Sequence, residues 1–181
     1  MVYLFLAEGF EEIEALTPVD ILRRGRVDIT TVGVGGREIK GSHGIVVKAD
    51  ISTAELDTSD MEAVILPGGM PGTKNLEADS TVVSTVMECY DNGGVVGAIC
   101  AAPSVFGHMG ILRGRRATAF PGFEAELEGA VGGADGYVEV DGNVITARGM
   151  GVSVDFGLAL LSALKGKETA EKVRSAIQCR P

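Results

Sequence analysis

Apolar residues follow two patterns along this chain of 181 residues. Some stand in short uninterrupted runs, and others recur every three or four positions over longer segments. An uninterrupted run is typical of a strand buried on both faces of a parallel sheet, and the longer period is typical of an amphipathic helix. The runs predict strands at residues 2–7, 27–34, 63–66 and 95–99. The periodic segments predict helices at residues 10–24, 80–91, 102–109, 152–164 and 168–176.

Strands that alternate with helices predict an α/β fold with a doubly wound, mostly parallel sheet flanked by helices. Shorter patterns predict a pair of strands at 37–40 and 45–49, short helices at 53–57 and 122–128, a strand near 117–119, and a hairpin of 137–140 with 144–147. Because no repeat or linker interrupts the chain, we expect a single domain over residues 1–181.

The first predicted helix carries a carboxylate within its apolar stripe. Helical spacing places Glu14 on one face, while Glu11 and Glu12 are predicted to point to solvent and to suit the helix dipole. Pro18 is expected to bend or break this helix. Burial would raise the pKa of Glu14 and make it a proton carrier, although a surface position fits the pattern equally well. The remaining residues of the predicted stripe are Phe10, Ile13, Thr17 and Ile21.

Cys100 stands where the strand at 95–99 ends, among the small residues of the segment GAICAAP. A strand that stops at a nucleophile and turns at once into a helix has the pattern of a nucleophile elbow. The start of a helix lowers the pKa of a thiol, which favours a reactive Cys100. The alternative is an inert buried thiol, and we interpret Cys89 in that way because it shares a helix face with valines.

No histidine after Cys100 is placed to assist it. The next residue is Ala101, and His108 lies roughly 12 Å away along the same predicted helix. A Cys-His-Glu triad of the amidotransferase kind is therefore excluded among the residues that follow Cys100, and Glu14 remains as the candidate partner. The backbone N–H groups of Gly69 and Ala101 could form an oxyanion hole, although Gly68-Gly69 also fits a simple tight loop.

Composition limits the partners and the cofactors. A formal net charge of −9 argues against nucleic acid or an anionic membrane surface as a partner. No apolar stretch reaches transmembrane length, and the first apolar run is too short for a signal peptide. Three cysteines without a CxxC pair predict a cytoplasmic protein with reduced thiols. The acidic first turn and the missing phosphate-binding motif predict no nucleotide cofactor. His43 and His108 are too few and too scattered to predict a metal site.

Four segments together resemble the ThiJ/PfpI superfamily, and most closely its Parkinsonism-associated deglycase branch. They are AEGFEEIEALTPVDILRR, VILPGGMPGTKNL, GAICAAPSVF and ARGMG with FGLALLSAL after it. The resemblance covers nearly the whole chain. It implies a flavodoxin-like fold, a homodimer, a reactive cysteine at Cys100 and a protonated carboxyl at Glu14. It also implies backbone donors at Gly69 and Ala101.

The chain departs from this family at three positions. The peptidase and chaperone branches have histidine where this chain has Ala101, which disfavours peptidase chemistry. Some deglycase-branch members have histidine where Phe120 precedes Pro121. Some relatives have arginine in place of His43, which with Arg24 is a candidate to face the site across a dimer interface.

The resemblance and the residues predict a cofactor-independent enzyme of the glyoxalase or deglycase type. Its substrate would be a small α-oxoaldehyde or a glycated protein. The candidate catalytic residues are Cys100 and Glu14, with Gly69, Ala101 and His43 as candidate oxyanion- or substrate-binding residues. The alternative is a sensor of oxidative stress with little turnover, in which Cys100 is oxidised. Amidase activity and thiazole-phosphate biosynthesis are disfavoured by the missing histidine and the acidic first turn.

Overall fold

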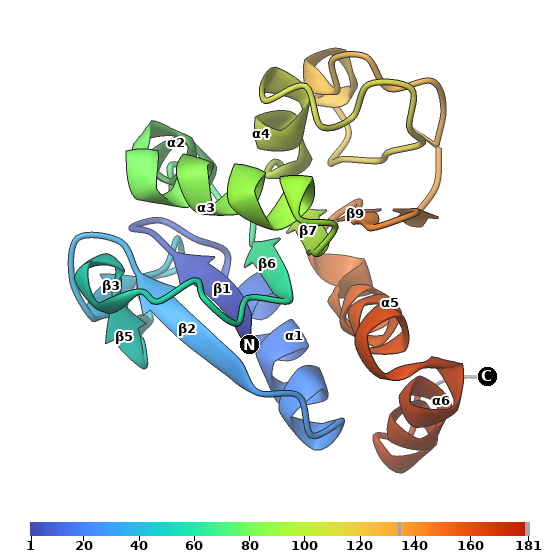
Figure 1. The fold of residues 1–181 in the computed structure, drawn as a ribbon, viewed down its shortest axis with the longest axis horizontal. Coiled ribbons are helices and arrows are strands. Elements are labelled where there is room, and N and C mark those ends of the chain that lie inside the picture. Colours follow the sequence, from blue (N-terminus) through green and yellow to red (C-terminus); the bar gives the residue numbers. More distant parts are fainter. Residues whose placement is uncertain (134, 180–181) are drawn as a thin grey trace.

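A seven-stranded sheet forms the centre of the computed structural model, which describes residues 1–133 and 135–179 (Figure 1). Its strand order is β5-β2-β1-β6-β7-β9-β8. All neighbouring strands are parallel except β8 and β9, which form an antiparallel hairpin. The strands are β1 (Val2–Leu6), β2 (Ile29–Gly33), β5 (Ile51–Ser52), β6 (Ala63–Leu66), β7 (Val95–Ile99), β8 (Val138–Asp141) and β9 (Val144–Ala147). A separate small sheet pairs β3 (Glu38–Lys40) with β4 (Val46–Lys48).

Helices cover both faces of the sheet (Figure 1). One layer holds α1 (Glu12–Arg24), α5 (Ser153–Lys165) and α6 (Lys167–Ala176). The other holds α2 (Gly72–Ala78), α3 (Ser80–Asp91) and α4 (Pro103–His108). Three single 3₁₀ turns complete the elements: η1 (Thr53–Glu55), η2 (Glu124–Glu126) and η3 (Met150–Val152). None of the described helices is long and apolar enough to cross a membrane.

Strand β1 shows why the central runs are apolar throughout. Leu4 and Leu6 join the core cluster on the α1 side, and Tyr3 and Phe5 join the cluster on the α3 side. Successive side chains of a strand point to opposite faces, so a strand covered on both faces needs apolar residues at every position. The predicted α/β fold with a mostly parallel sheet is confirmed, and the predicted bounds of β6, β7 and α3 agree with the structure.

The stretch between α4 and β8 differs from the prediction. Residues 117–119 form no strand, and the only pairing described nearby is an isolated bridge between Arg116 and Gly132. The N–H of Thr118 donates instead to the Thr146 hydroxyl at 2.9 Å, so a side chain replaces the backbone partner that a strand would need. The helix predicted at 122–128 is reduced to the single turn η2.

Helix α1 corrects three expectations. Pro18 lies inside a continuous helix, where its Cα is 3.3 Å from the position that a Cβ on Gly157 of α5 would take. Ile13 was predicted to be buried, but its side chain is 48% exposed. Glu12 was predicted to be solvated, but it is 3% exposed. Compared with the predicted apolar stripe, the buried face of α1 therefore includes Glu12 and excludes Ile13. Burial of Glu12 and Glu14 is possible because both have polar partners inside the protein.

Candidate active site

Cys100 lies at the carboxyl end of β7 with φ at +66°, in the left-handed region of the backbone. Its N–H donates to the carbonyl of Ala147 at 2.9 Å, and its carbonyl accepts from the N–H of Phe120 at 2.8 Å. A non-glycine residue in this region is strained, and such strain persists only where surrounding contacts hold it in place. The predicted sharp turn at Cys100 is present, and α4 begins three residues later.

Glu14 reaches Cys100 from the first turns of α1. Its side chain is 1% exposed, and Oε2 accepts the N–H of Gly68 at 3.0 Å. The Met150 N–H and the Cys100 thiol also form hydrogen bonds with this carboxyl group. A Cβ on Gly68 would lie 2.6 Å from the Cβ of Cys100 and 2.6 Å from Glu14 Oε2. The contact between the thiol and the carboxyl group therefore requires glycine at position 68.

Burial sets the electrostatics of this pair. It raises the pKa of Glu14 to about 7, helped by the nearby charge of Glu11. Burial, followed by the Glu14 carboxylate, raises the pKa of Cys100 to about 12. The predicted lowering of the Cys100 pKa is therefore wrong for a thiol that faces an ionised Glu14. Helix α4 has only six residues, and its dipole does not offset the loss of water around the sulfur.

Hydrogen bonds from Gly69 and Ala101 N–H groups to the Cys100 sulfur act in the opposite direction and favour the thiolate. When Glu14 carries a proton, its repulsion of the thiolate disappears and it becomes a further donor. Two groups that interact this strongly ionise as a pair. The pair holds both protons below about pH 7 and one shared proton between about pH 7 and about pH 12.

The structure thus brings together four of the predicted site residues: Cys100, Glu14, Gly69 and Ala101. The fifth, His43, belongs to a different cluster, in which its Nδ1 lies 3.0 Å from Glu12 Oε2. The roles assigned to these five residues remain predictions.

Two other predicted positions have partners of their own. Arg24, at the end of α1, pairs with Asp20 at 2.6 Å. His108 contacts Glu77 at 2.6 Å and Glu126 at 2.9 Å.

An apolar pocket of about 350 Å³ adjoins this site. Phe120, Tyr137 and Met150 line it, and Arg148 lies over the Tyr137 ring. A Cβ on Gly149, also in the lining, would be 3.2 Å from the Phe120 ring and 3.9 Å from Glu14 Oε1, so the pocket meets the buried carboxyl group. Sequence reasoning missed Tyr137, Arg148 and Met150, because the pocket forms only when the hairpin of β8 and β9 brings its two ends together, where the Arg148 N–H donates to the Tyr137 carbonyl at 2.9 Å.

The fold and the site together define the class of this protein. It is an α/β protein of the flavodoxin-like kind, and a cysteine at a strained turn of its central strand is hydrogen-bonded to a buried carboxyl group. The chain belongs to the DJ-1/PfpI family, whose model matches residues 1–163. The resemblance predicted from the four sequence segments is confirmed.

Several known proteins are similar over almost the whole chain. Drosophila melanogaster protein DJ-1alpha is 38% identical over 178 residues, which cover 96% of this chain and 82% of that protein. Arabidopsis thaliana protein DJ-1 homolog B is 34% identical over 97% of this chain. This chain spans less than half of the Arabidopsis relatives, 41% of homolog B and 46% of homolog A. A deglycase of Pyrococcus abyssi is 29% identical over 81% of this chain and 89% of that protein.

The oxidised DJ-1 of Toxoplasma gondii has a similar solved structure. Its TM-score is 0.93 at 29% sequence identity, and the match covers 97% of this chain and 96% of that chain. The flavodoxin-like fold expected from the resemblance is confirmed by this similarity.

Proposed function

We propose that this chain is a cofactor-independent enzyme of the glyoxalase or deglycase type, which acts on small α-oxoaldehydes or on their early adducts with protein side chains. The observation that carries the proposal is the contact of Cys100, held at a positive φ, with the buried carboxyl group of Glu14. A nucleophile and a proton carrier in direct contact are the two groups that this chemistry needs. The deglycase of Pyrococcus abyssi among the relatives supports the same class of activity.

The reaction can be written with methylglyoxal as substrate. The sulfur of Cys100 attacks the aldehyde carbon while Glu14 accepts the thiol proton. Glu14 then passes that proton to the former aldehyde oxygen, which gives a neutral hemithioacetal and an ionised Glu14. The oxygen that becomes negative during the attack accepts hydrogen bonds from the Gly69 and Ala101 N–H groups. The pocket lined by Phe120 and Met150 then has room for the methyl group.

Proton transfer completes the reaction without an external oxidant. The ionised carboxylate of Glu14 removes the proton from the former aldehyde carbon and passes it to the ketone oxygen, which gives an enediol. It then removes the proton from the hydroxyl group on the former aldehyde carbon and passes it to the neighbouring carbon. The aldehyde carbon is thereby oxidised to a thioester, and the ketone carbon is reduced to an alcohol. Water cleaves the thioester, which releases lactate and restores the thiol. A carboxyl group with a pKa of about 7 can both accept and donate a proton at neutral pH.

Lactate formation from methylglyoxal tests the proposal. The wild type should produce lactate, Cys100→Ala should abolish its formation, and Cys89→Ala should retain it. Circular dichroism of the three proteins controls for folding. Equal lactate formation by wild type and Cys100→Ala would rule out Cys100 as the nucleophile, and no turnover by the wild type on either free aldehyde or glycated peptide would refute the enzyme.

The alternative function is a sensor of oxidants in which the Cys100 thiol is converted to a sulfenic or sulfinic acid. The relative from Toxoplasma gondii, whose solved structure is of an oxidised form, favours this candidate. Here the carboxyl group of Glu14 would stabilise the oxidised sulfur by a hydrogen bond. Mass spectrometry after mild peroxide treatment separates the two functions. Oxidation confined to Cys100 together with negligible lactate formation would favour the sensor.

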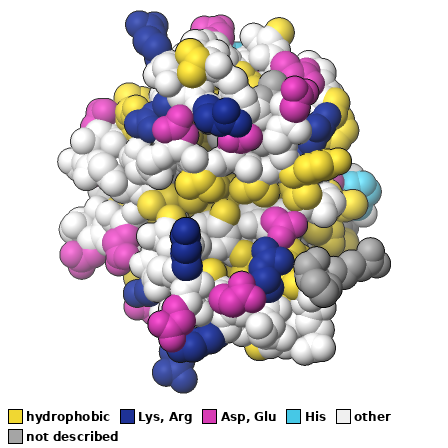
Figure 2. Space-filling model, turned by 90° about the vertical axis from the view of Figure 1, so that its right-hand side faces the viewer, with side chains coloured by type: hydrophobic (Ala, Val, Ile, Leu, Met, Phe, Trp, Pro, Cys, Tyr) yellow, Lys and Arg dark blue, Asp and Glu magenta, His cyan; other side chains and the backbone are white. Residues whose placement is uncertain are grey.

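We also propose that two copies of the chain associate through the exposed apolar side chains near the start of α1. Ile13 and Leu16 on α1 and Ile45 and Val46 near β4 are between 39% and 59% exposed. Figure 2 shows that hydrophobic side chains also gather in a band across one face of the molecule. Sedimentation of wild type and Ile13→Glu tests this: a dimer that becomes a monomer supports the interface, and an unchanged sedimentation coefficient contradicts it.

A further inference from the structure

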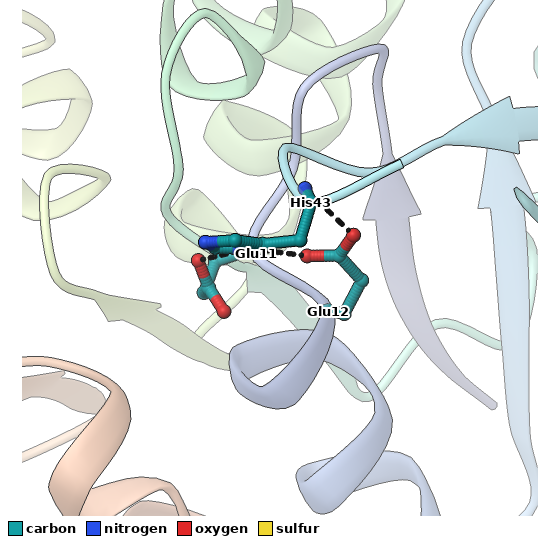
Figure 3. Close-up of side chains that lie close together, drawn as sticks. All are labelled: Glu11, Glu12 and His43. Carbon is teal, nitrogen blue, oxygen red and sulfur yellow. Dashed lines mark hydrogen bonds and ion pairs between the residues drawn. The ribbon is translucent and has the colours of Figure 1, made fainter. Parts of the chain in front are cut away.

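Glu11, Glu12 and His43 form a second cluster of chemically active side chains (Figure 3). The two glutamates come from the start of α1, and His43 comes from the turn between β3 and β4. One ligand atom from each lies within 4.8 Å of the other two. Sequence analysis predicted no metal site because the chain has only two histidines, but it did not consider carboxylates that folding places beside one of them.

Among the four polar atoms at the centre of this cluster, five of the six separations lie between 3.0 and 3.4 Å. His43 Nδ1 lies 3.0 Å from Glu12 Oε2, 3.4 Å from Glu11 Oε2 and 3.1 Å from Ser42 Oγ. Ser42 Oγ lies 3.3 Å from Glu11 Oε2 and 3.4 Å from Glu12 Oε2. A tetrahedral zinc ion with ligands at about 2.0–2.2 Å holds its ligand atoms about 3.3–3.6 Å apart. These five separations need to change by only a few tenths of an ångström for the atoms to surround such an ion, and the two glutamate oxygens lie within 4.8 Å of each other.

The rest of the structure fixes Glu12 in the orientation of a ligand. Its Oε1 accepts the backbone N–H groups of His43 at 2.9 Å and Ile45 at 3.4 Å, which leaves Oε2 directed at the His43 ring. A Cβ on Gly41 would lie 2.3 Å from Oε1, so the backbone approaches this carboxylate closely. Hydrogen bonds that hold a carboxylate in this way are typical of the outer shell of metal sites.

Capping of the turn between β3 and β4 does not account for the whole cluster. The backbone N–H groups of the turn are accepted by Oε1 of Glu12 alone. The four atoms described above include the other oxygen of this carboxylate, Oε2, which these N–H groups do not contact. Only two hydrogens are available to join those four atoms, one on Nδ1 and one on the Ser42 hydroxyl. Two carboxylate oxygens thus share a single ring proton and a hydroxyl proton, whereas one cation between the four atoms would contact all of them directly.

We propose that Glu11, Glu12 and His43 bind one divalent transition-metal ion of the zinc class, with the corner near Ser42 available to its hydroxyl or to water. Imidazole nitrogen with carboxylate oxygens suits zinc and its first-row neighbours, whereas magnesium and calcium prefer six or more oxygen ligands. The His43 side chain is 69% exposed, so an ion reaches the cluster directly from solvent. The site is separate from Cys100 and does not depend on the proposed enzyme activity.

The chain supplies a matched control in its second histidine. His108 also contacts two glutamates, but Glu77 faces its Nδ1 and Glu126 faces its Nε2. The two ring nitrogens point in opposite directions, so one ion cannot contact all three side chains. The same residue types therefore occur once in a chelating arrangement and once in an arrangement that cannot chelate.

Calorimetric titration with zinc chloride after treatment with a chelator tests the site. The experiment uses the Cys100→Ala background, so that the thiol cannot bind the metal. We expect one zinc ion per chain, at least tenfold weaker binding in Glu11→Gln and in His43→Gln, and unchanged binding in His108→Gln. Cobalt should give the visible bands of a four-coordinate ion in the same background, and an excess of magnesium should not displace zinc.

Four outcomes would overturn the proposal. These are no zinc binding, unchanged affinity in both cluster variants, equal loss in His108→Gln, or binding that occurs only when Cys100 is present. Glu11 is partly exposed and accepts no backbone hydrogen bond with its side chain among the described contacts, so Glu11→Gln keeps the test valid where a change at His43 unfolds the turn.

Discussion

Cys89 and Cys100 are both removed from water, yet the protein treats the two thiols differently. Cys89 lies in the last turn of α3, packed in an apolar cluster that includes valines, and its Sγ contacts the carbonyl of Val95 at 3.5 Å. Burial raises its pKa to about 11. Cys100 stands at a strained backbone position and shares hydrogen bonds with Glu14, Gly69 and Ala101.

The difference shows that burial alone does not make a cysteine inert or reactive. Both pKa values are raised chiefly by desolvation. What distinguishes Cys100 is a partner that can take its proton and backbone donors that can stabilise negative charge. Four measurements would break or sharpen this contrast.

The largest effect is expected when the carboxyl group beside Cys100 is replaced, compared with the carboxyl group beside Cys89. Glu14→Gln should lower kcat/KM for methylglyoxal by roughly 10²–10⁴, because the amide cannot exchange a proton with the substrate. Glu88→Gln removes the carboxylate whose charge raises the pKa of Cys89, and it should leave kcat/KM unchanged. Initial rates of lactate formation check both. Comparable losses of kcat/KM in the two variants would show that a neighbouring carboxyl group does not distinguish Cys100 from Cys89.

The second effect concerns stability. The folded-state pKa of Glu14 is raised from 4.5 to about 7. Its contribution to stability is fully present below about pH 4.5 and is lost as the pH rises through about 7. That loss amounts to roughly 3 kcal/mol in the free energy of unfolding.

Urea unfolding at several pH values tests this loss. Glu14→Gln has no such titration, so the stability of the wild type relative to this variant should fall between pH 4.5 and pH 7. Glu88→Gln should show no comparable change relative to the wild type. A difference between wild type and Glu14→Gln that does not vary with pH would contradict the raised pKa.

The third effect concerns access to the two thiols. Iodoacetamide reacts with the thiolate. Labelling of Cys89 should be roughly thirtyfold slower than that of an exposed thiol, because a local opening of α3 that costs about 2 kcal/mol must come first, whereas labelling of Cys100 needs no opening of a helix and is limited by its raised pKa. Peptide mass spectrometry separates these two sites from Cys179, which is partly buried near the end of the chain. Labelling of Cys89 at the rate found for the same protein unfolded in urea would mean that α3 opens freely and that burial does not protect this thiol.

The smallest effect per unit of change is the pH dependence of turnover. The wild-type kcat/KM should rise about tenfold per pH unit below about pH 7 and level off above it, because the pair must lose one proton before the sulfur can attack. Residual turnover of Glu14→Gln should lack this step at pH 7. A wild-type profile that is flat from pH 5 to pH 9 would contradict the shared ionisation of Cys100 and Glu14.

Sequence predicts this protein best where one local pattern determines the structure. The runs at 63–66 and 95–99 are apolar at nearly every position because helices cover both faces of the sheet, and their bounds were predicted correctly. Small residues around Cys100 likewise predicted the sharp turn that the structure contains.

Interactions between distant segments account for the errors. Glu12 was assigned to solvent because its partners, His43 and Ile45, lie in a turn about thirty residues away. The strand expected at 117–119 failed to form because Thr118 pairs with the side chain of Thr146, which no local pattern indicates. The pKa of Cys100 is expected from the helix that follows it to be lowered, whereas burial raises it and α1 supplies the charge of Glu14, which raises it further.

The hydrogen bond from Gly68 to Glu14 spans 54 residues of sequence, and this distance sets an order of events during synthesis. When α1 leaves the ribosome, its buried face is still in water and Glu14 ionises as an ordinary glutamate. The strands β6 and β7, which bring Gly68 and Cys100 to it, are made later. We therefore expect a nascent chain that stops before β6 to carry an α1 whose Glu14 is ionised and unpaired, and the thiol to meet its proton carrier only when β7 joins the sheet.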